Sequence, residues 1–510
     1  MNYNNLGEMF LSVATKKGSK KYIFFENDVY TYSEAKNLIL KYANALKKQG
    51  LKKGDRVGVL LENSPEFIFA IFAIFVNGAV AVPINTFLKK DEISYILSNC
   101  EAKFLISSDV FYDEIKDLNV KSLQNKFSFG SQKLPDLKKF AEGESADFTI
   151  PEMNLDDIAI LIYTSGTTGN PKGAMLTHKN LLSNCDACNV AFKIKKNDRF
   201  LLFLPMFHSY AFTTCIMLPT FTGCSIIILK SVMELKKKSF KKVLLFKRPT
   251  FFLGVPQVYT ALSKAKLPNW FIKFLYPVRI HVSGGAPLPE EILKEFVGKF
   301  KRPILEGYGL SEASPVVSVN REEEQRPYSV GPALPGVEVK VVDDNEVELP
   351  VGEVGELIVK GPNVMKGYWN MPEATNMTVK NGWLFTGDMA KLDEDGFIYI
   401  VDRKKDLIIV KGINLYPREI EELIYTYEGV EAAAVIGIPD KASGEVPVAY
   451  ILSKEGAKLD AGKIKEYLKE HLANYKIPKH IYIVNELPLT ATGKVLKRKL
   501  KEQVLGDAVK

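Results

Sequence analysis

A loop rich in glycines and hydroxyl groups is the part of this sequence best suited to bind a polyphosphate. Residues 163–178 read YTSGTTGNPKGAMLTH and directly follow the apolar run 158–162. Glycines let the backbone approach an anion closely, serine and threonine hydroxyls donate hydrogen bonds, and a lysine adds positive charge. We therefore expect the phosphates of a nucleotide to be bound by Thr164, Ser165, Gly166, Thr167, Thr168, Gly169 and Lys172.

The spacing within this loop differs from that of a Walker A motif. A Walker A motif places four residues between its first glycine and a Gly-Lys-Ser/Thr triplet. Counting from Gly166, that triplet would fall on Pro171, Lys172 and Gly173. A flexible linker is also a poor explanation, because apolar strand and helix patterns flank the loop on both sides.

A second glycine-rich segment, GYGLSE at residues 307–312, follows the short apolar strand 303–305. A dinucleotide-binding fingerprint would need a glycine where Glu312 stands, so the segment argues against a dehydrogenase. Glu312 supplies a carboxylate at that position, and carboxylate oxygens can bind hard cations. Further along, the tripeptide TGD at residues 386–388 contains a second carboxylate, Asp388, and carries little information by itself.

In this order and spacing, these segments resemble the adenylate-forming superfamily, which includes acyl-CoA synthetases, aryl-CoA ligases, luciferases and peptide-synthetase adenylation domains. The resemblance covers essentially the whole chain. It implies that Tyr308 stacks on adenine, that Thr164 and Glu312 hold Mg²⁺, that Asp388 binds ribose and that Arg403 contacts the nucleotide. It adds to the nucleotide site Glu306, Gly307, Gly309 and Ser311.

The resemblance also assigns roles near the carboxy terminus. Residues 488–494, PLTATGK, match the loop that carries the family's catalytic lysine, so Lys494 is expected to stabilise the charge that develops on the α-phosphate. Lys405 matches the position about which a small domain turns. Lys411 and Gly412 match the face that lines the CoA tunnel.

The acid substrate is expected to bind beside the nucleotide. His208, in PMFHSY, matches a residue near the acyl pocket of many relatives, and we include it among the catalytic candidates, although a lone histidine is more often structural. Small residues in SGGAP at 283–287 leave room for an acyl chain, and GVP at 254–256 adds an apolar wall. The expected pocket consists of Tyr210, Val255, Gly284, Gly285 and Ala286.

The resemblance implies an ATP-dependent acid–CoA ligase that forms an acyl-adenylate and then a thioester. Segments 308–320 and 401–406, with Gly361-Pro362, look closest to bacterial long-chain fatty-acid CoA ligases, so a medium- or long-chain fatty acid is expected. The run FHSYA at 207–211 is also similar to plant-type aryl-CoA ligases, which leaves a benzoate- or cinnamate-type acid as the alternative. An acyl-AMP ligase that loads a carrier protein is a further alternative.

The elements that position these residues alternate along the chain. Strand patterns at 56–61, 104–107, 158–162, 225–229 and 278–282 alternate with helical patterns such as 32–49 and 290–300. This alternation predicts parallel α/β layers, and residues 331–359 predict a small β-rich subdomain. Five charged residues at 402–406 separate two apolar strands.

We therefore predict an N-terminal domain over residues 1–401, with two α/β subdomains and a small β-rich subdomain, then a hinge at 402–406 and a mobile α+β C-terminal domain over 407–510. A chain of 510 residues exceeds what one hydrophobic core usually holds. Five scattered cysteines do not suggest a disulfide framework or a structural metal site, and Cys185 and Cys188 are expected to pack within a helix.

The formal charge of +8 includes short clusters at Lys236–Lys238 and Lys497–Lys499, and we expect no single basic arm. This charge suits ATP or CoA, and no nucleic acid is expected. The start of the chain lacks the features of a signal peptide, and we interpret the apolar stretch 67–82 as a buried helix rather than a membrane span. These features predict a cytoplasmic protein and leave room for peripheral membrane contact.

Overall fold

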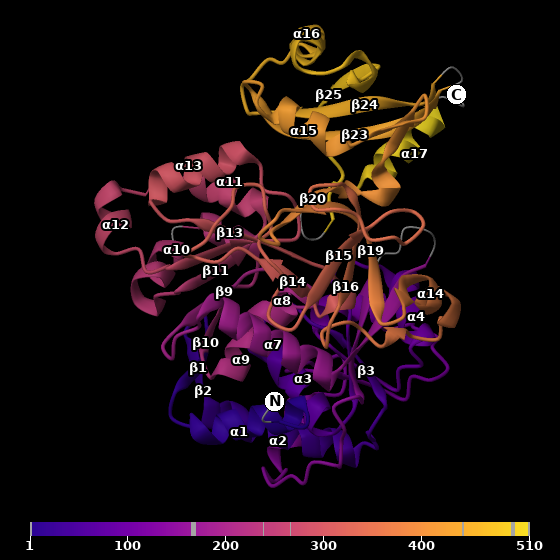
Figure 1. Ribbon diagram of the computed structural model, residues 1–510. Coiled ribbons are helices and arrows are strands. Elements are labelled where there is room, and N and C mark those ends of the chain that lie inside the picture. Colours follow the sequence, from indigo (N-terminus) through magenta and orange to yellow (C-terminus); the bar gives the residue numbers. More distant parts are fainter. Residues whose placement is uncertain are drawn as a thin grey trace.

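The computed structural model describes residues 3–164, 170–237, 239–265, 267–440, 443–490 and 495–507 (Figure 1). Two large sheets of seven and eight strands and a five-stranded sheet form the main body. A second five-stranded sheet belongs to a separate unit, which lies at the top of Figure 1. The α/β class predicted from the alternation of strands and helices is confirmed.

The seven-stranded sheet carries the phosphate loop at one of its edges. Its strand order is β17-β8-β7-β4-β3-β5-β6, with a parallel centre and an antiparallel β7–β8 pair. Its strands are β3 (Arg56–Leu60), β4 (Val80–Pro83), β5 (Phe104–Ser107), β6 (Asn125–Ser128), β7 (Ile158–Thr164), β8 (Lys172–Thr177) and β17 (Gly367–Tyr368).

The eight-stranded sheet has the order β14-β13-β12-β11-β9-β10-β1-β2, and its six inner strands run parallel. Parallel strands are covered on both faces, which explains apolar runs such as Ser225–Ile228. The strands are β1 (Lys21–Phe25), β2 (Asp28–Thr31), β9 (Arg199–Leu202), β10 (Ser225–Ile228), β11 (Phe251–Gly254), β12 (Ile280–Ser283), β13 (Ile304–Gly309) and β14 (Val316–Val319).

The helices of the main body begin where the sequence supplies caps. Thr31 and Glu34 form a capping box at α2, and the Ser64 side chain caps α3. The helices are α1 (Leu6–Lys16), α2 (Tyr32–Lys48), α3 (Pro65–Val76), α4 (Lys90–Asn99), α5 (Tyr112–Ile115), α6 (Leu137–Glu142), α7 (His178–Phe192), α8 (Ser209–Ala211), α9 (Leu218–Thr222), α10 (Ser239–Lys242), α11 (Pro256–Lys264), α12 (Asn269–Phe274), α13 (Glu290–Phe300) and α14 (Pro372–Thr378).

The apolar stretch 67–82 is only partly the buried helix that we expected. Helix α3 ends at Val76, and a turn at Asn77 and Gly78 leads into strand β4. Every residue of α3 except Glu66 is buried. Within the described part of the chain, no helix is long and apolar enough to cross a membrane.

The main body also contains a β-rich part, which extends beyond the predicted residues 331–359 as far as Arg403. Its five-stranded sheet has the order β15-β16-β19-β18, with β20 paired to β19. The strands are β15 (Glu338–Val342), β16 (Gly355–Lys360), β18 (Val379–Lys380), β19 (Trp383–Leu392) and β20 (Ile398–Arg403).

The C-terminal unit begins after a 3₁₀ turn, η6 (Lys404–Asp406), where the chain leaves one sheet and enters another. The expected hinge at 402–406 contains this passage, and the turning motion stays a prediction. The elements of the unit are β21 (Ile408–Val410), β22 (Ile413–Leu415), α15 (Pro417–Tyr425), β23 (Val430–Asp440), β24 (Gly444–Ser453), α16 (Ala461–His471), β25 (His480–Val484) and α17 (Lys497–Asp507).

All five cysteines are free and buried. Cys185 and Cys188 lie on the buried side of α7, as expected for packed helix residues. Burial raises the pKa of both thiols, so these side chains act as small apolar groups in the core.

Candidate active site

Three side chains predicted to bind the nucleoside meet where the ends of β13 and β20 lie beside the middle of β19. The Tyr308 hydroxyl donates a hydrogen bond to Oδ2 of Asp388 at 2.6 Å. The guanidinium Nε of Arg403 lies 3.2 Å from Oδ1 of the same carboxylate. Asp388 and Arg403 are direct neighbours in the β19–β20 register, which explains their pairing. Each oxygen of Asp388 can accept a further hydrogen bond, so the carboxylate can still bind a ribose hydroxyl.

The electrostatics of this cluster keep Tyr308 and Arg403 in defined protonation states. Burial and the nearby Asp388 carboxylate raise the pKa of Tyr308 well above its usual range. Burial opposes the charge on Arg403, but Asp388 raises its pKa all the same. The phenol is therefore a neutral donor and the guanidinium a permanent cation at neutral pH.

The phosphate loop connects β7 to β8, whose ends are paired so that Thr164 faces Lys172. Lys172 lies with its ammonium nitrogen 5.3 Å from the centre of the Tyr368 ring. The five central loop residues predicted to bind phosphate lie outside the described residues; these are Ser165, Gly166, Thr167, Thr168 and Gly169.

Tyr368 joins the phosphate loop to the predicted magnesium ligand. Its hydroxyl donates a hydrogen bond to Oε1 of Glu312 at 2.8 Å. Burial and the Glu312 charge raise the pKa of Tyr368, which keeps this hydroxyl protonated. Strand β17, which contains Tyr368, pairs with β8 directly beside the loop. Sequence reasoning missed this residue, and its only signal was an aromatic pair, Tyr368-Trp369, after a glycine.

Glu312 is suited to hold a phosphate-bound Mg²⁺ ion. Within the described ranges, Oε2 of Glu312 accepts no hydrogen bond from the protein, so one carboxylate oxygen is left for a ligand. The described residues form no cluster of three or more carboxylate, histidine or cysteine side chains. Magnesium in nucleotide sites is usually held by one or two carboxylates together with phosphates and water, and this arrangement fits that pattern.

The remaining residues of the GYGLSE segment serve mainly to shape the site. A Cβ atom at Gly309 would lie 2.2 Å from the carbonyl oxygen of Pro315, so only glycine fits against the next strand. A Cβ atom at Gly307 would lie 3.2 Å from the backbone oxygen of Ser318, so the space there is also tight. Ser311 shares a hydrogen bond of 2.9 Å with Ser209, which ties the nucleotide segment to the acyl segment.

Glu306 lies at the boundary of the site and is almost fully buried. Burial raises the pKa of its carboxyl group to about 7, against the opposing charge of Arg418. Its backbone oxygen accepts a hydrogen bond from Asn320, which fixes the end of β13. The structure therefore places Glu306 beside the C-terminal unit as well as next to the predicted nucleotide residues.

The predicted acyl residues gather at the ends of β11 and β12. The Tyr210 hydroxyl lies 3.4 Å from the carbonyl oxygen of Gly254, and a Cβ atom at Gly284 would lie 3.2 Å from the Tyr210 ring. A Cβ atom added at Gly285 would lie 3.7 Å from the Val255 side chain. Ala286, the next residue, is half-buried. These residues therefore form one continuous wall.

His208 has a structural use in this segment. Its Nδ1 accepts a hydrogen bond from the backbone N–H of Tyr210 at 3.2 Å and so caps helix α8. A catalytic role for His208 remains a prediction, because the capping bond alone accounts for a histidine there.

A mostly apolar groove of about 1150 Å³ begins at this wall. Val255 belongs both to the groove and to the predicted acyl pocket, and Phe207, Phe203 and Phe252 line it nearby. Thr490 and Glu431 of the C-terminal unit also line the groove. The C-terminal unit therefore stands at the border of the acyl site in this arrangement.

The residues predicted for CoA binding lie apart from this cluster. Lys411 and Gly412 form the exposed turn between β21 and β22, both with positive φ angles of 51° and 82°. The backbone N–H of Lys411 donates to Ser443 in the same unit. Within the described ranges, no hydrogen bond or ion pair joins this turn to Tyr308, Asp388 or Glu312.

Lys405, the predicted pivot, lies exposed in η6. The predicted catalytic lysine, Lys494, lies outside the described residues.

Arg418 fastens the C-terminal unit to the main body, a role that sequence reasoning missed. Its guanidinium NH1 donates to the carbonyl oxygen of Ile400 at 2.6 Å, and its backbone N–H donates to Asp402 at 2.9 Å. Burial raises the pKa of Asp402, and Lys497 lies close enough to oppose this effect. Strand β20 and helix α15 are thus held together across the passage between the two sheets.

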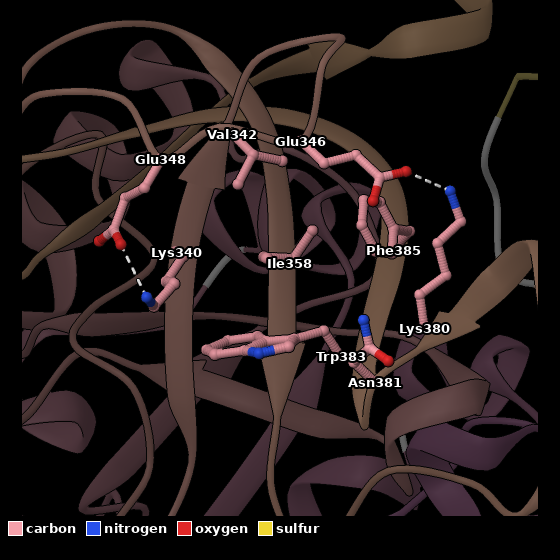
Figure 2. Close-up of a pocket in the computed structure, with 9 residues that line it drawn as sticks. All are labelled: Lys340, Val342, Glu346, Glu348, Ile358, Lys380, Asn381, Trp383 and Phe385. Carbon is pink, nitrogen blue, oxygen red and sulfur yellow. Dashed lines mark hydrogen bonds and ion pairs between the residues drawn. The ribbon is translucent and has the colours of Figure 1, made fainter.

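A second, smaller pocket is a surface depression of the five-stranded sheet of the main body (Figure 2). Lys340 pairs with Glu348 and Lys380 pairs with Glu346 on either side of Trp383. Its volume is about 200 Å³, and none of the predicted site residues lines it. We therefore exclude it from the candidate active site.

Comparison with known proteins agrees with this geometry. A family model described as AMP-binding enzyme matches residues 10–369, and a model of the AMP-binding enzyme C-terminal domain matches residues 419–494. The long-chain-fatty-acid–CoA ligase of Bacillus subtilis (strain 168) is 35% identical over 524 residues, covering 96% of this chain and 93% of that protein. The feruloyl-CoA synthase of Amycolatopsis sp is 36% identical over 477 residues, covering 93% and 94%.

Solved structures are similar over the whole chain. ATP-bound MatB from Rhodopseudomonas palustris superposes with a TM-score of 0.91 at 34% identity, covering 98% of this chain and 99% of that one. The o-succinylbenzoate CoA synthetase of Bacillus subtilis, in complex with its acyl-adenylate intermediate, has a TM-score of 0.84 at 29% identity, covering 98% of both chains.

Proposed function

This chain belongs to the AMP-binding enzyme family and is an AMP-forming acid–CoA ligase, and we propose that its acid is a medium- or long-chain fatty acid. The proposal depends chiefly on one observation, the large apolar groove that begins at Val255. Relatives in this family act on acids as different as fatty acids and ferulate by their names, so the substrate must be argued from the site.

In the first step, a carboxylate oxygen of the acid attacks the α-phosphorus of ATP, and the bond to pyrophosphate breaks. We assign Tyr308, Asp388 and Arg403 to the nucleoside, because they form one connected cluster. Lys172 and the loop that it follows hold the phosphates. Lys494 stabilises the charge on the α-phosphate as the new bond forms.

Mg²⁺ would be held by Glu312 and Thr164 together with the ATP phosphates, where it neutralises phosphate charge. The Tyr368 hydroxyl orients the Glu312 carboxylate through its 2.8 Å hydrogen bond. A carboxylate that is already oriented loses less conformational freedom when a ligand arrives.

In the second step, the CoA sulfur attacks the acyl carbon, and AMP leaves with the electrons of the broken bond. Lys411 and Gly412, which lie on an exposed turn, are proposed to line the CoA path after the C-terminal unit has rotated about Lys405. Within the described residues, no hydrogen bond or ion pair joins this turn to the nucleotide cluster, which agrees with such an alternation.

The groove supports a fatty acid because of its size and lining. Its volume of about 1150 Å³ exceeds the usual range for small-molecule pockets, and phenylalanine, leucine and valine side chains are prominent in its lining. An extended alkyl chain gains free energy with each methylene group that it buries. A single aromatic ring would leave most of this surface exposed.

An aromatic acid is the alternative, and Tyr210 favours it. The Tyr210 ring lies against Gly284, where an added Cβ atom would be 3.2 Å from it, and this aromatic face could stack on an aromatic acid. The feruloyl-CoA synthase of Amycolatopsis sp is as similar in sequence as the fatty-acid ligase. An acyl-AMP ligase that transfers to a carrier protein would use the same adenylating residues and would not need free CoA.

The decisive experiment measures pyrophosphate release with saturating ATP and CoA over a series of acids. We expect kcat/KM to rise with fatty-acid length and to stay low for benzoate, cinnamate, ferulate and malonate. A maximum with ferulate or cinnamate would contradict the proposal. Thioester formation without added CoA, on a supplied carrier protein, would indicate the carrier-loading alternative.

A bulky side chain in the groove tests whether the alkyl chain lies there. Ala261→Trp places an indole against the groove wall, and we expect at least tenfold lower kcat/KM for long acids with little change for short ones. Val297→Trp, on the exposed side of α13 and outside the groove, is the matched control. Equal loss for short and long acids would place the alkyl chain elsewhere.

A further inference from the structure

The segment between strands β10 and β12 concentrates the positive charge of this chain. Residues 230–274, which we call the basic lobe, contain eleven lysines and arginines and only one acidic residue, Glu234. The rest of the chain has 57 basic and 59 acidic residues, so its net charge is −2 against +10 for the lobe. The expectation that no single arm carries the charge was therefore wrong.

The basic lobe also exposes large apolar side chains. Phe246, Phe274 and Trp270 are 77%, 71% and 60% exposed, and Met233 and Val232 are exposed as well. Trp270 and Phe274 are four residues apart on α12, so they lie on the same side of that helix. Helix α12 forms the outer edge of the lobe at the left of Figure 1.

The exposure of these side chains does not come from poor packing. Phe240, Leu244, Phe271 and Ile272 of the same lobe are buried in one core with strand β11 and helix α13. The lobe therefore combines a packed core with exposed lysines and several large exposed apolar side chains. Large exposed apolar groups that gather on a surface usually mark an interaction site.

The apolar groove opens within the basic lobe. Met233, Lys236, Lys241, Lys264 and Leu267 of the basic lobe all line the groove. Leu267 is followed directly by Pro268 and then by α12. The exposed aromatic residues and the mouth of the groove are thus continuous along the chain.

We propose that the basic lobe docks on the surface of an anionic lipid bilayer. Lysines near such a surface are attracted by lipid phosphates, while tryptophan and phenylalanine insert at the level of the headgroups. A nucleic acid would attract the same lysines, but it offers no apolar medium for Val232, Met233 and Phe246. The combination of charge and exposed apolar residues favours lipid.

The inference does not depend on which acid the enzyme activates. If the proposed fatty-acid specificity holds, docking would also place the mouth of the groove against the compartment in which long acids dissolve. If the enzyme prefers an aromatic acid, the docking proposal is still tested by vesicle binding alone.

The test is cosedimentation of the full-length protein with phosphatidylcholine vesicles that contain or lack phosphatidylglycerol. We expect binding to the anionic vesicles, and we expect high salt to weaken it because screening reduces the attraction of lysines. A wild-type protein that stays in the supernatant with anionic vesicles at low salt would overturn the proposal.

Two double variants locate the contact on the basic lobe. Lys242→Glu with Lys273→Glu should lower the affinity for anionic vesicles at least tenfold, and Trp270→Ala with Phe274→Ala should lower it several-fold. The matched controls are Lys121→Glu with Lys139→Glu, which change the net charge equally elsewhere, and Met377→Ala, which removes an exposed apolar side chain on α14. Equal losses in variants and controls would overturn the assignment.

Two further measurements test whether the variants are folded and whether the surface prefers a nucleic acid. Circular dichroism and pyrophosphate release with a short acid should be unchanged in both double variants, because none of the four substituted residues lines the groove. A fluorescent DNA duplex provides the competitor. If the duplex binds more tightly than anionic vesicles and loses affinity in the same variants, the surface is a nucleic-acid interface and the lipid proposal is wrong.

Discussion

Tyr308, Asp388 and Arg403 hold one another in place through hydrogen bonds and charge. Each of them comes from a different part of the chain, and the carboxylate at their centre is nearly buried. Groups fixed by such contacts lose little conformational freedom on binding a ligand. At the scale of single residues, the nucleoside site is therefore pre-organised.

Tyr308→Phe removes one hydrogen bond to a charged carboxylate and keeps the ring for stacking. Such bonds contribute about 1.5–3 kcal/mol, so we expect the KM for ATP to rise about ten- to a hundredfold with a smaller change in kcat. Steady-state pyrophosphate release checks this. Tyr482→Phe, on an exposed ring of β25, is the control, and an unchanged KM in Tyr308→Phe would remove Tyr308 from the nucleoside site.

Glu306 should make stability depend on pH. Burial raises its pKa from the ordinary value of 4.5 to about 7, so between these values the folded state keeps a proton that the unfolded state has lost. The free energy of unfolding should therefore fall by about 3 kcal/mol as pH rises through this window. Below pH 4.5 this penalty is absent.

Glu306→Gln cannot ionise and should lack this decline. We expect the Tm of wild type to fall more steeply than that of Glu306→Gln between pH 5 and pH 8, as measured by thermal unfolding in matched buffers. Glu324→Gln, at an exposed position, should follow wild type. Parallel Tm curves for wild type and Glu306→Gln would show that Glu306 titrates near its ordinary pKa in the folded protein.

At the scale of elements, strand β20 and helix α15 form one contact between the main body and the C-terminal unit. Arg418 donates hydrogen bonds to both Ile400 and Glu422, so its guanidinium bridges β20 to the first turns of α15. The contact is local and polar. Contacts of this kind can be exchanged at small cost when a domain rotates.

Arg418→Ala should loosen this contact and so slow the step that uses this arrangement. We expect adenylate formation to fall about tenfold, because a charge-assisted hydrogen bond to Ile400 is lost, while thioester formation from supplied acyl-AMP is nearly unchanged. Arg498→Ala removes an equivalent but exposed pair with Glu502 four residues along α17, and it should affect neither step. Loss of both steps in Arg418→Ala would indicate a general folding defect.

At the scale of the whole molecule, two half-reactions must share one nucleotide cluster. Lys494→Ala should abolish adenylate formation and leave thioester formation from supplied acyl-AMP largely intact. Lys405→Pro should do the reverse, because proline fixes φ and removes a backbone donor where rotation is proposed. Single-turnover assays of each half-reaction check both variants, and equal losses in both half-reactions would contradict domain alternation.

Sequence patterns predicted the elements best where caps and periodicity agree. The strand 104–107 and the helix 290–300 have the predicted bounds, and the antiparallel return after β7 brings Lys172 opposite Thr164. Local apolar patterns did not separate α3 from β4, because a buried helix and a buried strand are equally apolar.

The contacts between distant residues could not be predicted from local patterns. Tyr308 and Asp388 are 80 residues apart and meet only because the fold brings the end of β13 beside the middle of β19. Tyr368 and Arg418 act through a neighbour, Glu312 in one case and Ile400 in the other, and neither belongs to a motif that chemistry alone would select. The charge of the basic lobe can be counted from the sequence. Only the fold shows that lysines of this lobe line the groove.

The passage of the chain through η6 makes that turn the covalent tether between the two lobes. Because this turn contains Lys404 and Lys405 and directly follows Arg403, trypsin has adjacent cleavage sites there. A nicked enzyme would keep its lobes together only through non-covalent affinity, so its turnover would become dilution-dependent. The intact tether supplies the effective concentration that makes lobe closure a first-order event.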